Sequence, residues 1–272
     1  MAKAAQMSGE DLGPNGLGKD HYSRIKALMA RLRADCTWDK AQSFETIAPY
    51  TIEESYEVAD AIARNDMSEL KAELGDLLFQ VLFHAQLASE VPTAKGGFDL
   101  DDVCGGLIEK MVRRHPHVFE GPDGMTDKPD WDAIKKAERA GKGKTGVLAD
   151  VPLALPELMR AEKLQKRAAK TGFDWPDTIG VWDKINEEMD EVREAIDGGE
   201  ADAIEDEIGD LLFAVTNLAR HCNIKPETAL RRTNAKFTAR FEYIEAHANK
   251  PLEELSLDEM EALWVAAKET GS

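Results

Sequence analysis

The stretch Glu73-Leu-Gly-Asp-Leu-Leu-Phe79 returns almost unchanged as Glu207-Ile-Gly-Asp-Leu-Leu-Phe213, 134 residues further along the chain (207 − 73). The same interval relates a group of glutamates upstream of each stretch. A repeat of this length at a fixed interval indicates that one structural unit has been duplicated. The five acidic pairs that the interval relates are Glu53 and Glu187, Glu54 and Glu188, Glu57 and Glu191, Glu73 and Glu207, and Asp76 and Asp210.

Both copies are predicted to be helical hairpins. Apolar residues recur at helical spacing around each quoted stretch, and convincing strand alternation is absent, so the predicted fold class is all-α. In the first copy, one helix follows Pro49 over residues 51–64, and a second begins at Asp66, whose spacing to Glu69 is that of a capping box. In the second copy, a helix over residues 185–196 ends at Gly198-Gly199, and the next is capped at Asp202.

Composition predicts the division of the chain. Residues 1–20 are expected to form a flexible tail, 21–120 the first unit, 121–150 a linker and 151–272 the second unit. The linker is rich in Gly, Pro, Asp and Lys, with a short helix expected near Trp131 to Arg139.

Charge and cysteine content exclude several classes of protein. The chain has 272 residues and a net charge of −18, which disfavours nucleic acid and anionic membrane surfaces as partners. There is no apolar run long enough to span a membrane. The three cysteines form no C-x-x-C pair, which favours neither a disulfide framework nor a zinc site and fits the cytoplasm.

The repeated carboxylates predict a site for a hard cation. Glu53, Glu54 and Glu57 crowd one helix turn, where each like-charged pair costs roughly 0.2–0.5 kcal/mol. A hairpin would turn them toward Glu73 and Asp76, near the edge of the core. Oxygen ligands suit Mg²⁺ or Mn²⁺ better than zinc or copper. A di-iron bundle is disfavoured because no Glu-x-x-His occurs.

Further segments carry a family resemblance. They are Cys36-Thr-Trp-Asp39, Ile47-Ala-Pro-Tyr-Thr-Ile-Glu-Glu54, Arg113-Arg-His-Pro-His-Val-Phe119 and Gly172-Phe-Asp-Trp175. Together with the doubled carboxylates, they resemble the MazG family of nucleoside triphosphate pyrophosphohydrolases over nearly the whole chain after residue 20. The resemblance implies hydrolysis of nucleoside triphosphates to nucleoside monophosphate and pyrophosphate, with Mg²⁺ as cofactor and Mn²⁺ as a possible substitute.

The resemblance also implies residue roles. Glu187 and Glu53 are expected to orient or deprotonate the attacking water. The expected metal ligands are Glu188, Glu191, Glu207 and Asp210 in the second unit, and Glu54, Glu57, Glu73 and Asp76 in the first. The expected nucleotide contacts are Asn234, Lys236, Arg240, Trp264 and Lys268 in the second unit, and Lys110 and Arg114 in the first. Ile108 stands where Asn234 would align, so the first unit lacks one polar contact.

The sequence also predicts how the chain assembles and which unit is the main catalyst. Each hairpin would leave a wide apolar face, so we expect a homodimer in which four-helix-bundle cores are completed across chains. Because its set of nucleotide contacts is fuller, the second unit is expected to be the main catalyst. The alternative is a non-catalytic protein that binds a nucleotide or a protein partner for regulation.

Overall fold

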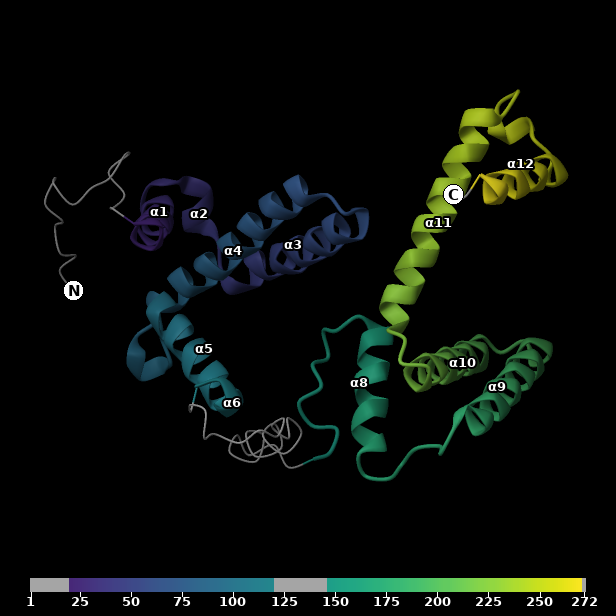
Figure 1. Ribbon diagram of the computed structural model, residues 1–272, viewed down its shortest axis with the longest axis horizontal. Coiled ribbons are helices and arrows are strands. Elements are labelled where there is room, and N and C mark those ends of the chain that lie inside the picture. The colour runs from purple at the N-terminus through teal and green to yellow at the C-terminus, as the bar shows by residue number, and fades with distance from the viewer. Residues whose placement is uncertain (1–19, 120–145, 271–272) are drawn as a thin grey trace, which may run out of the picture. The chain divides into compact units, whose positions relative to one another are not determined.

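The computed structural model describes residues 20–119 and 146–270, which are helical without strands, as predicted (Figure 1). The chain separates into two compact units, Met1–Ile134 and Lys135–Ser272. The expected tail up to residue 19 and most of the expected linker, including the helix near Trp131, lie outside the described residues. Among the described helices, none is long and apolar enough to cross a membrane.

The first unit is built around the antiparallel hairpin of α3 and α4. Asn65 reverses the chain between them in the left-handed conformation (φ 56°), and Asp66 caps α4 by accepting from the Ser68 and Glu69 backbone N–H groups. Helices α1 and α5 pack on α4. The elements are α1 (His21–Asp35), α2 (Thr37–Ala41), α3 (Phe44–Arg64), α4 (Met67–Ser89), η3 (Thr93–Lys95), α5 (Leu100–Arg114) and α6 (Pro116–Phe119).

The expected start of the first hairpin is wrong. Helix α3 begins at Phe44 and contains Pro49, because Ser43 and Thr46 form a capping box ahead of the proline. Thr51 therefore lies inside the helix, where its hydroxyl contacts His84 Nε2 at 2.9 Å.

The second unit repeats the hairpin with α9 and α10. Gly199 adopts the left-handed conformation (φ 75°) at the end of α9. The expected cap at Asp202 is wrong, because α10 begins at Ala201 and Asp202 lies in its first turn, where a carboxylate suits the helix dipole. The elements are α8 (Glu157–Ala169), α9 (Thr178–Gly198), α10 (Ala201–His221), α11 (Pro226–His247), η4 (Leu252–Glu254) and α12 (Leu257–Glu269).

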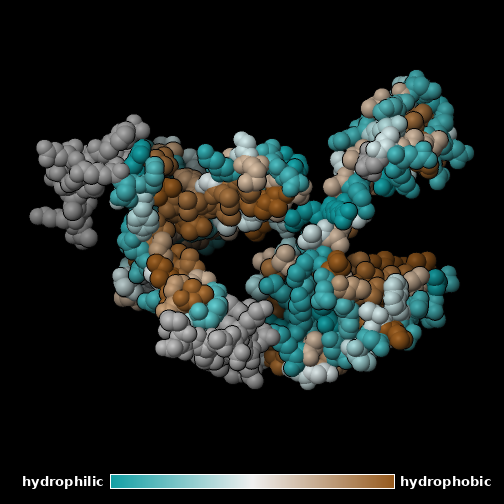
Figure 2. Space-filling view, in the orientation of Figure 1, coloured by the Kyte–Doolittle hydropathy of each residue, from teal (hydrophilic) through white to brown (hydrophobic). Residues whose placement is uncertain are grey.

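Both hairpins bury one face and expose another. The first unit's core is formed by Met29, Ile47, Leu82, Phe83, Ala85, Leu87 and Leu100, whereas the second hairpin's cluster has only Val181, Ile185 and Ala214. On the opposite side, apolar side chains gather along the α3–α4 hairpin and along α10 (Figure 2). The exposed residues include Leu74, Leu78 and Val81, and their partners in the repeat, Ile208, Leu212 and Val215. We call these six residues the hairpin faces.

Candidate metal and nucleotide sites

The first carboxylate cluster joins α3 to α4. One oxygen each from Glu54, Glu57 and Glu73 lies within 4.8 Å of the others. The 3.6-residue helical period places Glu54 and Glu57 on one side of α3, and the hairpin brings Glu73 of α4 opposite them. Gln80, two turns beyond Glu73, donates an amide hydrogen bond to Glu54 Oε1 at 3.4 Å.

Electrostatics in the first cluster favour a cation. Burial raises the pKa of Glu54, and the charges of Glu57 and Asp76 raise it further. The pKa of Glu73 is raised by desolvation first, and then by the same two carboxylates. Asp76 lies outside the close triplet, but its charge raises the pKa of both Glu54 and Glu73. A divalent ion would relieve this repulsion, which the protein alone leaves in place.

The second cluster takes one residue from the first helix of its hairpin and two from the second: one oxygen each of Glu188 of α9 and of Glu207 and Asp210 of α10 lies within 4.8 Å of the others. Glu188 is only 4 % exposed. Its Oε2 is buried and has no hydrogen-bond partner among the described residues. A buried carboxylate oxygen without a donor is costly, and its position among two further carboxylates fits a hard divalent cation.

Glu191 is the fourth expected ligand of the second unit and lies outside its close triplet. Its pKa is raised mainly by desolvation and by a hydrogen bond with Glu188, while Lys184 opposes the shift. Glu191 therefore shares the field of the cluster, as Asp76 does in the first unit. Glu53 and Glu187, the expected residues for orienting water, are both exposed beside their clusters.

Lys184 is a residue of the second site to which the sequence reasoning gave no role. Its Nζ lies 2.9 Å from Glu187 Oε1 and 2.7 Å from Glu188 Oε1. These two carboxylates raise the pKa of Lys184 well above its usual range. The signal was available, because a lysine three and four residues before two glutamates faces both on a helix. In the first unit, Tyr50 stands at the equivalent position.

The expected nucleotide contacts of the second unit lie on α11 and α12. The structure brings two of them together, since the Arg240 guanidinium lies over the Trp264 ring at 5.4 Å. Phe237 also packs on that ring, at 5.2 Å between centroids. The side chains of Asn234, Lys236 and Lys268 are exposed. None of these residues belongs to the carboxylate triplet.

In the first unit, Lys110 and Arg114 lie on α5. This helix begins at residue 100 and α11 at 226, an interval of 126 residues (226 − 100) that also separates Lys110 from Lys236 and Arg114 from Arg240. The two pairs therefore occupy matching places on matching helices. Lys110 lines a cavity of about 490 Å³ together with Phe98 and Leu107.

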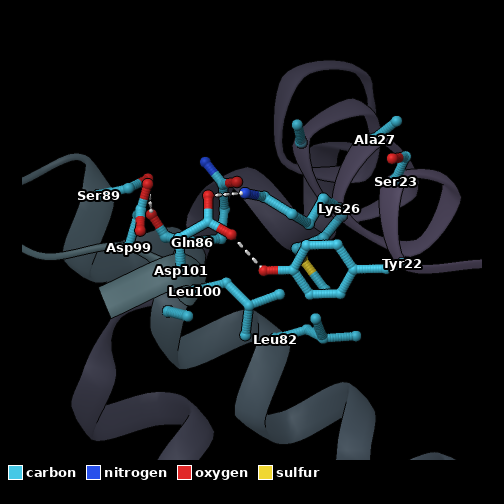
Figure 3. A pocket seen from close by; sticks show the side chains of 13 residues that line it. Tyr22, Ser23, Lys26, Ala27, Leu82, Gln86, Ser89, Asp99, Leu100 and Asp101 are labelled. Carbon is cyan, nitrogen blue, oxygen red and sulfur yellow. Dashed lines mark hydrogen bonds and ion pairs between the residues drawn. The ribbon is translucent and has the colours of Figure 1, made fainter. Parts of the chain in front are cut away.

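A separate cavity of about 500 Å³ lies between α1, α4 and the start of α5 (Figure 3). The Tyr22 hydroxyl and the Lys26 ammonium both point at Asp101, with Lys26 Nζ 2.6 Å from Oδ2. Leu82 and Leu100 lie beneath them. Since Leu82 is six residues beyond Asp76, about 9 Å along the helix, this cavity is distinct from the carboxylate cluster.

Comparison with known proteins identifies the family. The profile of the MazG nucleotide pyrophosphohydrolase domain matches residues 42–119 and 181–244, which hold both carboxylate clusters. The chain belongs to the MazG family. Both MazG matches contain one complete hairpin turn with its carboxylates, from α3–α4 or α9–α10, and extend into the helix after the hairpin.

Two relatives match the chain over nearly its full length. The nucleoside triphosphate pyrophosphohydrolase of Escherichia coli (strain K12) is 46% identical over 262 residues, which cover 92% of this chain and 97% of that protein. The nucleoside triphosphate pyrophosphohydrolase/pyrophosphatase MazG of Thermotoga maritima is 41% identical over 252 residues, which cover 91% and 95%. The MazG resemblance expected from the sequence is therefore confirmed.

Proposed function

We propose that this protein hydrolyses nucleoside triphosphates to nucleoside monophosphate and pyrophosphate, with Mg²⁺ as cofactor and Mn²⁺ as a substitute. The observation that carries the metal requirement is the buried Glu188 Oε2, which lies among two more carboxylates and accepts no hydrogen bond from the described protein. The names of the two relatives support the reaction.

In the second unit, Glu188, Glu191, Glu207 and Asp210 would hold the metal, and in the first unit Glu54, Glu57, Glu73 and Asp76 would do so. A divalent ion there supplies positive charge that neutralises the triphosphate and polarises its phosphorus. It also allows an acidic protein to bind a polyanion.

The chain's own residues handle the water and its proton. Glu187 and Glu53 are adjacent in sequence to the ligands Glu188 and Glu54, and their exposed carboxylates can accept a proton from water. The water oxygen forms a bond to the α-phosphorus, and the bond from that phosphorus to the bridging oxygen of pyrophosphate breaks. Lys184 holds Glu187 at 2.9 Å and thereby limits its rotamers before substrate arrives.

The nucleotide would be held by Asn234, Lys236, Arg240, Trp264 and Lys268 in the second unit and by Lys110 and Arg114 in the first. Arginine and lysine suit phosphate oxygens, and an indole ring offers a surface for a base. Because the second unit has the fuller set, we rank it as the main catalyst.

We also propose a homodimer formed through the hairpin faces. Leu74, Leu78 and Val81 repeat as Ile208, Leu212 and Val215, all exposed, and such a duplicated apolar surface is typical of an interface. Gly75 and Gly209 lie beside these residues, and a side-chain carbon added at either glycine would meet nothing within 4 Å in the described chain. The space suits the close approach of a partner helix.

The reaction is tested by incubating the full chain with Mg²⁺ and each nucleoside triphosphate and measuring pyrophosphate and orthophosphate separately. We expect pyrophosphate, its loss on chelation, and its return with Mg²⁺ or Mn²⁺. Release of orthophosphate alone, or nucleotide binding without any turnover, would refute the proposed reaction; the second result would favour a regulatory protein. Activity that survives complete chelation would refute the metal requirement.

A further inference from the structure

The two carboxylate clusters have equivalent expected ligands but different neighbours. At the position one turn before the glutamates, the first unit has Tyr50 and the second has Lys184. On the second helix of the hairpin, the first unit has Gln80, which bonds Glu54, and the second unit has Ala214 at the equivalent position. Both pairs are separated by the same 134 residues as the ligands, so they are equivalent places in the repeat.

In the second unit, the protein supplies its own cation. The Lys184 ammonium lies 2.7 Å from Glu188 Oε1, and this carboxylate has a side-chain exposure of only 5%. A second bond to Glu187 at 2.9 Å fixes the ammonium between the two carboxylates. A hydrogen bond between two charged groups is stronger than one between neutral groups, and burial of one partner shields it from solvent.

In the first unit, Glu54 has a neutral partner instead. Its Oε1 accepts a hydrogen bond from the amide of Gln80, at 3.4 Å. The Tyr50 ring lies against Trp38, with centroids 6.2 Å apart. The groups that shift the pKa of Glu54 are Glu57, Asp76 and Gln80, and none of these carries positive charge. The first cluster therefore keeps the repulsion between its carboxylates.

We infer that, without nucleotide, the first unit binds a divalent metal more tightly than the second, because the Lys184 ammonium already neutralises part of the charge of Glu188 and would repel a metal ion bound beside it. This inference rests on the metal sites of the proposed function and assigns them unequal roles. Lys184 is a positioning residue that keeps the second cluster assembled without metal. The pair is partly exposed, so the expected difference in affinity is roughly three- to tenfold.

Direct binding of Mn²⁺ to the full chain, followed by the electron paramagnetic resonance signal of free Mn²⁺, tests the inference without turnover. We expect the wild type to show a tighter and a weaker class of sites. Glu54→Ala should remove the tighter class and Glu188→Ala the weaker one. A single class in the wild type, or the opposite assignment, would overturn the inference.

Variants at the two equivalent positions, Lys184 and Tyr50, sharpen the test. Lys184→Gln should tighten the weaker class by the same roughly three- to tenfold. Tyr50→Lys places an ammonium three and four residues before Glu53 and Glu54, so it should weaken the tighter class. Lys163→Gln removes one exposed positive charge from α8 and is the control for net charge, with no change expected. Unchanged or weakened Mn²⁺ binding in Lys184→Gln would contradict the role of Lys184.

Pyrophosphate release measured on the same preparations separates this inference from the proposed function. Two classes of Mn²⁺ site that respond to Lys184→Gln and Tyr50→Lys, without pyrophosphate release, would refute the reaction and leave the inference standing. Pyrophosphate release with a single class of Mn²⁺ site would refute the inference and leave the reaction standing. Circular dichroism of each variant confirms that its helices are intact.

Discussion

Single residues carry most of the chemistry that the fold presents. Glu188 is 4 % exposed, and a buried carboxylate costs several kcal/mol unless a cation or several donors neutralise it. Lys184 neutralises one of its oxygens and leaves Oε2 without a donor. Glu188 Oε2 therefore still lacks a positively charged or donor partner, and the carboxylates of Glu207 and Asp210 lie close to Glu188.

The ranking of the two units is tested at Glu191 and Glu57, which are equivalent in the repeat. Glu191→Ala removes a carboxylate that interacts with Glu188 and Glu207, and should lower pyrophosphate release at least about 100-fold. Glu57→Ala alters the first cluster and should leave most of the activity. Both are measured as initial rates at saturating Mg²⁺ and nucleotide.

The matched control for Glu191 is Glu194→Ala, which removes a carboxylate one turn further along α9 and should leave the rate unchanged. Equal losses in Glu191→Ala and Glu57→Ala would show that the units contribute equally.

Residue spacing predicts which carboxylates meet, and it also accounts for the contacts of Lys184 but not for that of Gln80. Three of the four expected ligands in each unit form a close triplet, because i,i+3 spacing and a hairpin leave little freedom. The contact from Gln80 to Glu54 joins two helices and depends on side-chain rotamers that periodicity does not encode, whereas the contacts of Lys184 follow from i,i+3 and i,i+4 spacing on one helix. Whether these residues bind metal stays a prediction.

At the scale of elements, the duplication preserves the hairpins and varies the helices after them. Helices α3 and α9 have identical lengths and are related by the same 134 residues as the carboxylates. Helix α5 has 15 residues and α11 has 22, and their starts are related by 126 residues. The all-α prediction is confirmed, while three expected helix starts were wrong because the helices begin after Ser43, Asp177 and Glu200, upstream of the expected positions.

Helix α12 depends on its capping box, and this dependence predicts its response to mutation and acid. Ser256 accepts from the Glu259 N–H, and Glu259 accepts from the Ser256 N–H at 2.8 Å. Ser256→Ala should cost about 1 kcal/mol of helix stability and lower the hydrogen-exchange protection of α12. Since Trp264 lies on this helix against Arg240, the Michaelis constant for nucleotide should rise.

The acid response of the same helix follows from Glu259. The backbone of Ser256 and then Lys250 lower the pKa of Glu259 to about 2. A lowered pKa means that the stabilisation is present above the ordinary value and is lost as the pH falls from there toward 2. Protection of α12 that does not respond to this pH range, or to Glu259→Gln at neutral pH, would contradict the role of the capping box.

At the scale of the whole molecule, the second unit has little core of its own. Its hairpin cluster is Val181, Ile185 and Ala214, while Ile208, Leu212 and Val215 are exposed on α10. Burial of apolar surface contributes about 25 cal/mol per Å², so covering this face would add substantially to stability. The proposed homodimer supplies that cover, and its stability should rise with protein concentration.

The dimer is tested by placing a charge on a hairpin face. Leu212 is 53 % exposed in the single chain, and a glutamate there would be buried without a partner in the dimer, so Leu212→Glu should shift the mass in analytical ultracentrifugation toward the monomer. Leu78→Glu makes the equivalent change in the first unit. Leu257→Glu is the control, because Leu257 is 79 % exposed on α12 and lies outside both hairpin faces. A wild-type chain that sediments as a monomer at every concentration would refute the dimer, and the exposed hairpin faces would then need another partner.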